Sequence, residues 1–216
     1  MSATEFLRSQ CQSDWDAATQ HAFCSELADG TLPISKMKWY LAQDYKFIDG
    51  FVRLLATAIA HAPTLTDSVP AAQFLAVITG PENTYFLRSF EALDMTEGEI
   101  NAETAPETKA FQELMEQARH SGRYEEMLAV LVAAEWTYLS WAEPFENYSD
   151  DLPFWFAEWI DLHCGDYFSS VVNYLREQLD QCWLTLDEAQ QQNVLSVFKR
   201  AMAFERAFFD ASYQQG

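Results

Sequence analysis

The feature that most constrains the fold is an amphipathic stretch of roughly five helical turns that follows Gly30. Its apolar residues recur at intervals of three, four and seven, which on an α-helix form one face. They are Met37, Leu41, Ile48, Phe51 and Leu55. Asp44 occupies the position that would complete this face. Burying a carboxylate among apolar side chains is costly unless a partner compensates it, so the stretch predicts a core helix with a polar group on its buried side.

The rest of the chain is also predicted to be helical. No segment alternates apolar and polar residues long enough to indicate a strand, and only seven Gly and seven Pro interrupt 216 residues. We expect helices at 6–27, 31–61, 71–93, 106–120, 123–144 and 185–213, with a break or kink at Gly80-Pro81. Residues 154–182 are expected to form either one helix bent near Gly165 or two helices. Thr96–Glu99 and Thr185–Glu188 fit the capping-box pattern. The fold class predicted is all-α, with residues 1–216 forming one domain.

Composition limits the possible partners. The net charge is -20, from 33 acidic and 13 basic residues, which disfavours nucleic acid and anionic membranes as partners. A neutral or cationic small molecule fits better. The four cysteines are scattered without a zinc-binding spacing, and no apolar run is long enough to cross a membrane. We expect a cytoplasmic protein with reduced thiols.

Two further acids fall on apolar helical faces. Glu135 lies between Leu131 and Tyr138, and Glu205 completes a face that contains Phe198. Each acid alone could be a buried carboxylate bonded to a nearby Tyr, Trp or backbone donor, or could lie at the edge of its face. Three such acids on three helices favour a shared polar pocket, in which raised pKa values would suit acid or base catalysis.

The histidines argue against a metal site. A di-iron bundle needs Glu-x-x-His pairs, and none of the four His follows a Glu by three residues. Haem ligation needs only one His and stays open on spacing alone. His163 lies among Trp155, Trp159 and Phe168 and is the His expected near a pocket. The other three are expected to cap helices or lie on the surface.

Several motifs together resemble one family. HAFCSELADGTLP at 21–33, YLAQDYKFI at 40–48, AEWTY at 134–138 and the aromatic segment after Phe204-Glu205 are similar to segments of the TenA, or thiaminase II, family. The resemblance extends over the whole chain. It implies a helical bundle of the haem-oxygenase-like type without haem or another cofactor, assembled as a homo-oligomer (dimer or tetramer). It also implies hydrolysis of a C–N bond at the pyrimidine CH2 of thiamin or its breakdown products.

The resemblance also implies roles for individual residues. Asp44 would hydrogen-bond an aminopyrimidine, Phe47 would stack on it, and Tyr138 would bond a ring nitrogen. Phe111 and His163 fall where the family often has pocket tyrosines, and Glu205 would be the acid/base.

One position departs from the family pattern. Ala134 stands where many members have a nucleophilic Cys, so the chain resembles the Cys-lacking TenA_E branch, which is associated with salvage of aminopyrimidine and formylaminopyrimidine. Glu135 is the neighbouring candidate to replace the thiol, and Cys164 is a remote one.

The resulting hypothesis is hydrolysis of aminomethylpyrimidine, or its N-formyl form, to hydroxymethylpyrimidine. Phe47 and Trp136 would sandwich the ring, Glu205 would protonate the departing amine, and Glu135 would position or deprotonate water. Two alternatives are a binding or regulatory protein that kept the pyrimidine pocket without turnover, and an oxidase of the haem-oxygenase type that uses O2.

Overall fold

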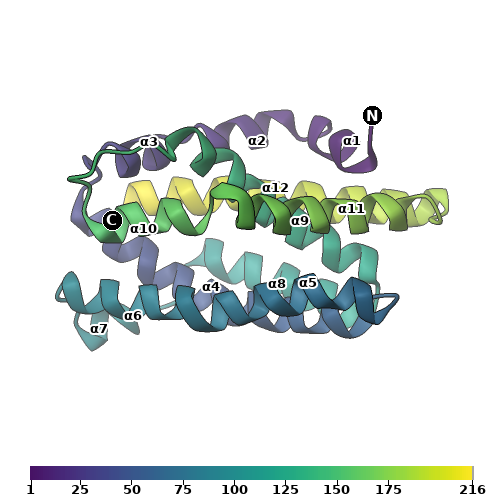
Figure 1. The fold of residues 1–216 in the computed structure, drawn as a ribbon, viewed down its shortest axis with the longest axis horizontal. Coiled ribbons are helices and arrows are strands. Elements are labelled where there is room, and N and C mark those ends of the chain that lie inside the picture. Colours follow the sequence, from purple (N-terminus) through teal and green to yellow (C-terminus); the bar gives the residue numbers. More distant parts are fainter. Residues whose placement is uncertain (216) are drawn as a thin grey trace.

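The chain folds into a bundle of helices that run mostly along one long axis (Figure 1). The structure is a computed structural model that describes residues 1–215, and none of these residues forms a strand. This confirms the predicted all-α class. In chain order the elements are α1 (Ala3–Ser9), α2 (Gln12–Thr19), α3 (Ala22–Ala28), α4 (Ile34–His61), α5 (Leu65–Val77), η1 (Ile78–Glu82), α6 (Asn83–Ala92), α7 (Glu97–Ile100), α8 (Pro106–Ser121), α9 (Tyr124–Ala142), η2 (Glu143–Phe145), α10 (Phe154–Leu162), α11 (Gly165–Trp183) and α12 (Glu188–Gln215).

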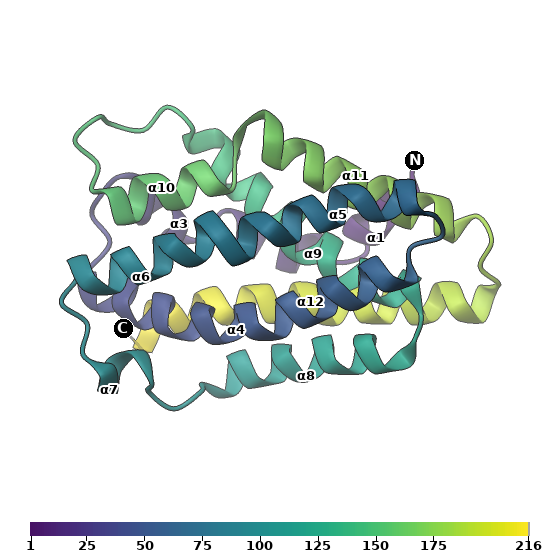
Figure 2. The same cartoon turned by 60° about the horizontal axis from the view of Figure 1, so that its bottom comes forward.

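Helix α9 is the centre of the bundle. Every residue from Met127 to Leu139 is buried, because α9 is surrounded by α2, α4, α8, α11 and α12. A helix that is apolar on all sides is expected in such a position. In Figure 2 the long helices α4 and α12 run beside one another, with α5 and α6 forming a continuous rod across them. The site described below lies where α4, α9, α10 and this rod meet.

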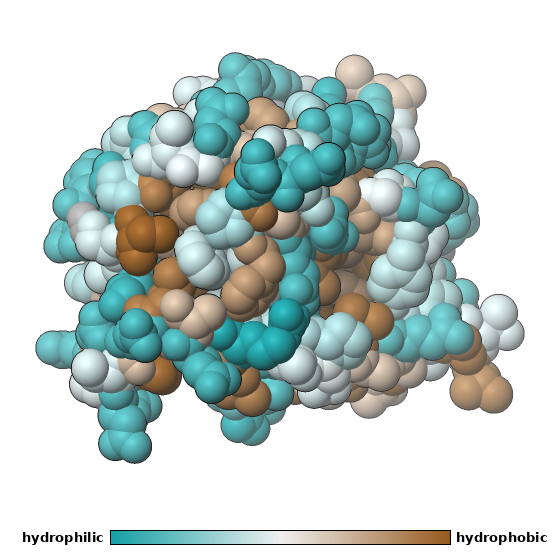
Figure 3. All heavy atoms as spheres, turned by 60° about the vertical axis from the view of Figure 1, so that its left-hand side comes forward, coloured by the Kyte–Doolittle hydropathy of each residue, from teal (hydrophilic) through white to brown (hydrophobic). Residues whose placement is uncertain are grey.

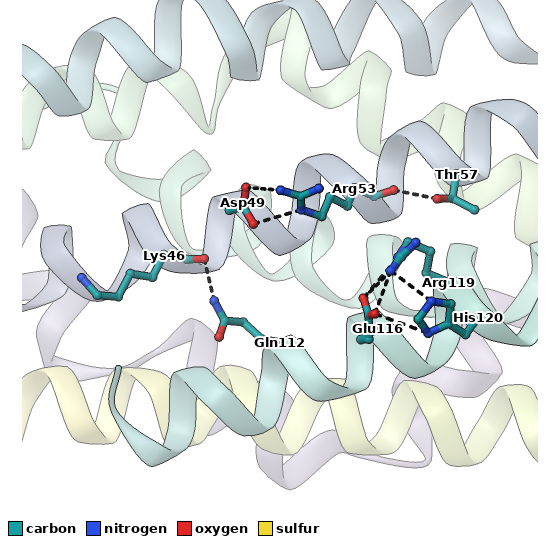
Figure 4. Close-up of polar contacts among 8 residues, drawn as sticks. All are labelled: Lys46, Asp49, Arg53, Thr57, Gln112, Glu116, Arg119 and His120. Atoms are coloured by element: carbon teal, nitrogen blue, oxygen red, sulfur yellow. Dashed lines mark hydrogen bonds and ion pairs between the residues drawn. The ribbon is translucent and has the colours of Figure 1, made fainter. Parts of the chain in front are cut away.

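The contact between α4 and α8 is partly polar on its outer side (Figure 4). The Gln112 side chain donates a hydrogen bond to the Lys46 carbonyl at 2.7 Å. Asp49 and Arg53 pair within α4, and Glu116 pairs with Arg119 within α8. Exposed pairs of this kind contribute little to stability, so α8 is held mainly by its apolar face. At the end of the bundle where α7 lies, hydrophilic and hydrophobic residues are interspersed (Figure 3).

The predicted first helix at 6–27 is wrong, because the structure divides this segment into α1, α2 and α3. Neither break contains Gly or Pro. The polar residues Gln10 and Gln20 end α1 and α2, and His21 begins α3 by accepting a hydrogen bond from the Phe23 N–H at its Nδ1, 3.0 Å away. The expectation that His21 caps a helix is thereby confirmed.

The predicted kink at Gly80-Pro81 is confirmed as the π-helical turn η1. The Thr96–Glu99 capping box is confirmed as well. The second predicted box is misplaced by two residues, since the reciprocal bonds join Asp187 and Gln190 at 2.9 Å each. None of the helices among residues 1–215 is both long and apolar enough to cross a membrane.

Candidate active site

A narrow cavity lies beside the middle of α9. It is lined mainly by aromatic and aliphatic side chains, into which acidic groups and one His project. The lining residues are Asp44, Phe47, Ile48, Phe51, Phe74, Ile78, Glu82, Ala134, Glu135, Tyr138, Trp159 and His163. An apolar lining with a few convergent polar groups is typical of a small-molecule site.

A smaller cavity adjoins the first. The two share Asp44, Phe47 and Tyr138, which therefore stand between them. Glu205 and Phe111 line only the smaller cavity. The structure thus gathers Asp44, Glu135 and Glu205 around one region, with Glu135 lining the larger cavity and Glu205 the smaller one.

A fourth acid belongs to the site and was missed by the sequence analysis. Glu82, at the end of the π-turn η1, is buried and lines the larger cavity. None of the four acids pairs with a Lys, Arg or His within residues 1–215. No Lys or Arg lines either cavity. The site therefore has four buried carboxyl groups and no basic side chain to balance them.

Burial keeps these carboxyl groups largely protonated near neutral pH. Loss of solvation raises the pKa of Asp44 to about 8, although the Tyr40 hydroxyl partly opposes the shift. Loss of solvation, followed by the charge of Asp44, raises the pKa of Glu82 to about 8. The pKa values of Glu135 and Glu205 are raised well above the usual range, again first by burial and then by neighbouring acids. These are the shifts expected of acid/base groups in a cleft.

Two of the carboxylate oxygens have no hydrogen-bond partner. They are Asp44 Oδ2 and Glu205 Oε1, both fully inaccessible to solvent. Buried polar atoms in folded proteins are nearly always hydrogen-bonded, and an exception calls for an explanation. A bound molecule that donates hydrogen bonds would satisfy both oxygens.

A hydrogen-bonded chain fixes one wall of the larger cavity. The Trp159 Nε1–H donates to the Tyr40 hydroxyl at 3.1 Å, and the Tyr40 and Tyr138 hydroxyl oxygens lie 2.8 Å apart. Tyr40 is a second residue that the sequence analysis did not assign to the site. Because Trp159 can only donate, its bond leaves the Tyr40 proton free to point toward Tyr138 or Asp44.

His163 lies in the cavity wall as a neutral ring. Its Nδ1 is 2.8 Å from the Trp159 carbonyl oxygen, and since a carbonyl only accepts, Nδ1 carries the proton and Nε2 is an acceptor. Burial lowers the pKa of His163 to about 4. The ring packs edge-on against Trp159, with centroids 4.3 Å apart.

Phe47 and Phe111 contact one another edge to face, with ring centroids 4.9 Å apart. Both are buried, and together they close the smaller cavity beside Glu205. This arrangement leaves a face of Phe47 available to both cavities.

Trp136 does not belong to the site, so the predicted ring sandwich with Phe47 is wrong. Its ring packs against Trp15 at a centroid distance of 4.8 Å and lies under the Arg176 guanidinium at 3.8 Å. Successive helical residues are rotated by about 100°. Trp136 therefore turns away from the face that Glu135 and Tyr138 share.

The structure also shows where Ala134 and Cys164, the two positions considered in connection with a thiol, lie relative to the cavities. Ala134 lines the larger cavity, whereas Cys164 is only partly buried and lines neither cavity. Among residues 1–215 no group of three or more His, Cys, Asp or Glu side chains has the arrangement of a metal site.

A helical bundle with a central cavity of buried acids and aromatic rings defines a small-molecule-binding protein of the haem-oxygenase-like fold class. Sequence comparison is more specific: the model of the TENA/THI-4/PQQC family matches residues 8–215, and the chain belongs to this family.

The full-length relatives include two curated bacterial proteins. The chain is 24% identical to an aminopyrimidine aminohydrolase of Halalkalibacterium halodurans, over 100% of this chain and 97% of the relative. It is also 24% identical to an aminopyrimidine aminohydrolase of Bacillus subtilis, over 100% and 91%. Among solved structures, a TenA family transcription regulator from a Silicibacter species superposes with a TM-score of 0.86 at 22% identity, covering 98% of this chain and 96% of that one. The last comparison supports the fold alone.

Proposed function

We propose that this protein is an aminopyrimidine aminohydrolase that releases hydroxymethylpyrimidine from aminomethylpyrimidine or its N-formyl form. The observation that carries the proposal is the pair of buried, unpartnered oxygens at Asp44 and Glu205, which flank an aromatic cavity without basic groups. An aminopyrimidine supplies N–H donors and a flat ring. The names of the two curated relatives support the same activity.

Binding of the ring uses three side chains in this proposal. Asp44 Oδ2 accepts a hydrogen bond from the ring amino group, and Phe47 stacks against the ring. Tyr138, held by its contact with Tyr40, donates to a ring nitrogen. Trp136 has no part in binding, since it packs against Arg176 outside the cavity.

The chemical step is displacement at the CH2 carbon by water. Glu135 in its ionised form accepts a proton from the water as its oxygen bonds to the carbon, and its raised pKa makes that form a stronger base. The C–N bond breaks with its electron pair going to nitrogen. Glu205, which burial holds in its protonated form, supplies the proton with which the nitrogen leaves. Ala134 offers no nucleophile, so no covalent intermediate forms at that position.

The test is release of ammonia from aminomethylpyrimidine by the purified protein. Glu205→Gln keeps the shape of the side chain but removes its acidity, and we expect kcat to fall by about 10²–10⁴-fold. Glu188→Gln is a matched control, because Glu188 is an exposed acid on the same helix. An unchanged rate in Glu205→Gln would contradict the assigned role.

The replacement of the nucleophile position by Ala134 favours one second candidate, a pyrimidine-binding protein without turnover. It would show ligand-dependent stabilisation against heat together with no release of ammonia. The same two measurements therefore separate the candidates.

The family resemblance also supports a homo-oligomer, a dimer or tetramer, in the cytoplasm. Light scattering on the purified protein tests the assembly, and fractionation of cells tests the compartment.

A further inference from the structure

Glu82 has an unusual position at the end of a π-helical turn. In η1 the chain passes through Gly80-Pro81, and Pro81 has no N–H with which to continue an α-helical hydrogen bond. Phe74, Ile78 and Glu82 follow one another at four-residue intervals along α5 and η1, and all three line the larger cavity. Such turns occur frequently at functional sites. Here the turn directs a carboxylate, rather than an apolar side chain, into the cavity.

The groups that face Glu82 are acidic, neutral or aromatic on every side. Helix α4 contributes Asp44, α9 contributes Glu135 and Tyr138, and the end of α10 contributes Trp159 and His163. His163 is a neutral ring because burial lowers its pKa to about 4. The described protein therefore offers no positive charge to Glu82 inside the cavity.

A second observation points to a ligand rather than to a mere cluster of acids. Asp44 is 3% exposed, lines the same cavity, and its Oδ2 has no hydrogen-bond partner. A buried and unpaired acceptor in this position is costly unless a donor arrives from outside. A molecule bound by Asp44 would extend within reach of the other lining groups, because they line the same narrow cavity.

We propose that Glu82 forms an ammonium subsite that makes this enzyme prefer a substrate with a cationic aminomethyl group over one with a neutral substituent. The inference rests on the proposed function and names the substrate class of the same site. Glu82 accepts hydrogen bonds from the ammonium group while Asp44 holds the ring. Charge-assisted hydrogen bonds of this kind are stronger than neutral ones, and they gain further strength where burial lowers the local dielectric constant.

The nitrogen at this subsite is positively charged whichever group protonates it. A primary alkylamine is an ammonium ion in water at neutral pH; when it passes a proton to a buried carboxylate on binding, Glu205 returns a proton to the nitrogen as the C–N bond breaks. A nitrogen that arrives neutral becomes charged when Glu205 protonates it. In both cases water supplies the new C–O bond, Glu135 takes its proton, and the C–N electron pair leaves with nitrogen.

The test compares two ligands that differ at one group, aminomethylpyrimidine and hydroxymethylpyrimidine. Binding is measured by calorimetry in a Glu205→Gln background, so that the amine is not consumed. With Glu82→Gln added, we expect the affinity for the aminomethyl ligand to fall at least about tenfold, while that for the hydroxymethyl ligand changes less than about threefold. Glu91→Gln is the matched control, since it removes an exposed acid from the neighbouring helix α6.

A further signature follows from the ionisation of Glu82. Burial, with the charge of Asp44 second, raises the pKa of Glu82 to about 8, so a bound cation should expel a proton from the cavity. The heat of binding of the amine should then depend on the ionisation enthalpy of the buffer at pH 7, and this dependence should weaken in Glu82→Gln. A merely structural role for Glu82 would change neither the ligand ratio nor the proton release.

The outcomes are distinguishable from failure of the proposed function. If wild-type protein releases no ammonia but Glu82→Gln loses the preference for the amine, the function fails and the subsite stands. Equal shifts for both ligands, or no shift, overturn the subsite even if turnover is observed. Should Glu82→Gln not fold, Glu82→Asp decides: withdrawal of the carboxylate by one methylene should lower the amine-to-alcohol affinity ratio, and an unchanged ratio overturns the proposal.

Discussion

Replacing Glu82 by Gln should stabilise the protein relative to wild type, and this gain should be larger at pH 8 than at pH 5. The pKa of the Glu82 carboxyl is about 8 in the folded protein, whereas the ordinary pKa of a Glu side chain is 4.5. Between these values the folded state binds a proton that the unfolded state has released. Stability is therefore greatest below pH 4.5 and is lost progressively as the pH rises toward 8. Gln does not titrate, so the variant lacks this loss.

The magnitude follows from the size of the shift. Each pKa unit corresponds to about 1.4 kcal/mol, so the full penalty above pH 8 is at most ~5 kcal/mol. Entry of water and relaxation around the charge reduce such penalties, and we expect a gain of about 2 kcal/mol for Glu82→Gln at pH 8. For a domain of this size that gain corresponds to roughly 4–8 °C in the melting temperature.

The assay is thermal unfolding of both proteins at several pH values from 5 to 8.5. The quantity of interest is the difference between variant and wild type, because the titration of surface carboxylates cancels in it. Glu91→Gln again controls for the loss of a negative charge at an exposed position. A difference in melting temperature that is the same at every pH would refute the reasoning, since it would mean that Glu82 is not buried as an acid with a raised pKa.

Two other side chains give independent predictions. Trp136→Leu should destabilise the protein by ~2–3 kcal/mol, because it loses packing and the contact with Arg176. We expect KM to change by less than about twofold. A large rise in KM without destabilisation would show that Trp136 belongs to the substrate site. Burial lowers the pKa of His163 to about 4 from the ordinary value of 6.5 for a His side chain. The contribution of His163 to stability is therefore present above pH 6.5 and is lost as the pH falls toward 4. Between pH 7 and pH 5 the free energy of unfolding of His163→Gln should therefore fall by ~2 kcal/mol less than that of wild type, as measured by denaturant unfolding. An NMR titration in which the imidazole of His163 is protonated near pH 6.5 would contradict the structure.

The long helices were predictable because their signals are local. Gly and Pro mark most of their ends, and the apolar face of α4 is continuous over seven turns of sequence pattern. The breaks that divide α1, α2 and α3 were not predictable in this way, since polar residues such as Gln10 and Gln20 can equally continue a helix. The start of α12 was misplaced for a related reason. Thr185 and Asp187 are both good capping residues, and only the path of the chain after α11 selects Asp187.

Three acids of the site were found because each interrupts a regular apolar face. Glu82 was missed although it begins a similar face, in which Tyr85, Phe86 and Phe90 follow at the third, fourth and eighth positions and are buried. The predicted kink at Gly80-Pro81 divided this segment, so the four-residue spacing that links Phe74, Ile78, Glu82 and Phe86 was not followed across it. Trp136 was wrongly included because proximity in sequence to Glu135 was taken as proximity in space.

The four acids come from α4, η1, α9 and α12, and this distribution has an energetic consequence. No single helix bears the whole cost of the cavity, yet each of the four carboxyl groups must either keep a proton or accept a positive charge from outside. Without a ligand the protonated forms prevail, as the raised pKa values of Asp44 and Glu82 indicate. A cation that enters can displace a proton and recover part of the electrostatic cost, so the same groups that weaken the empty fold at high pH provide the binding energy for an amine. Substitution of Glu82 by Gln should accordingly raise stability at high pH and lower amine affinity together, and a variant that raised both would show that Glu82 is not the cation site.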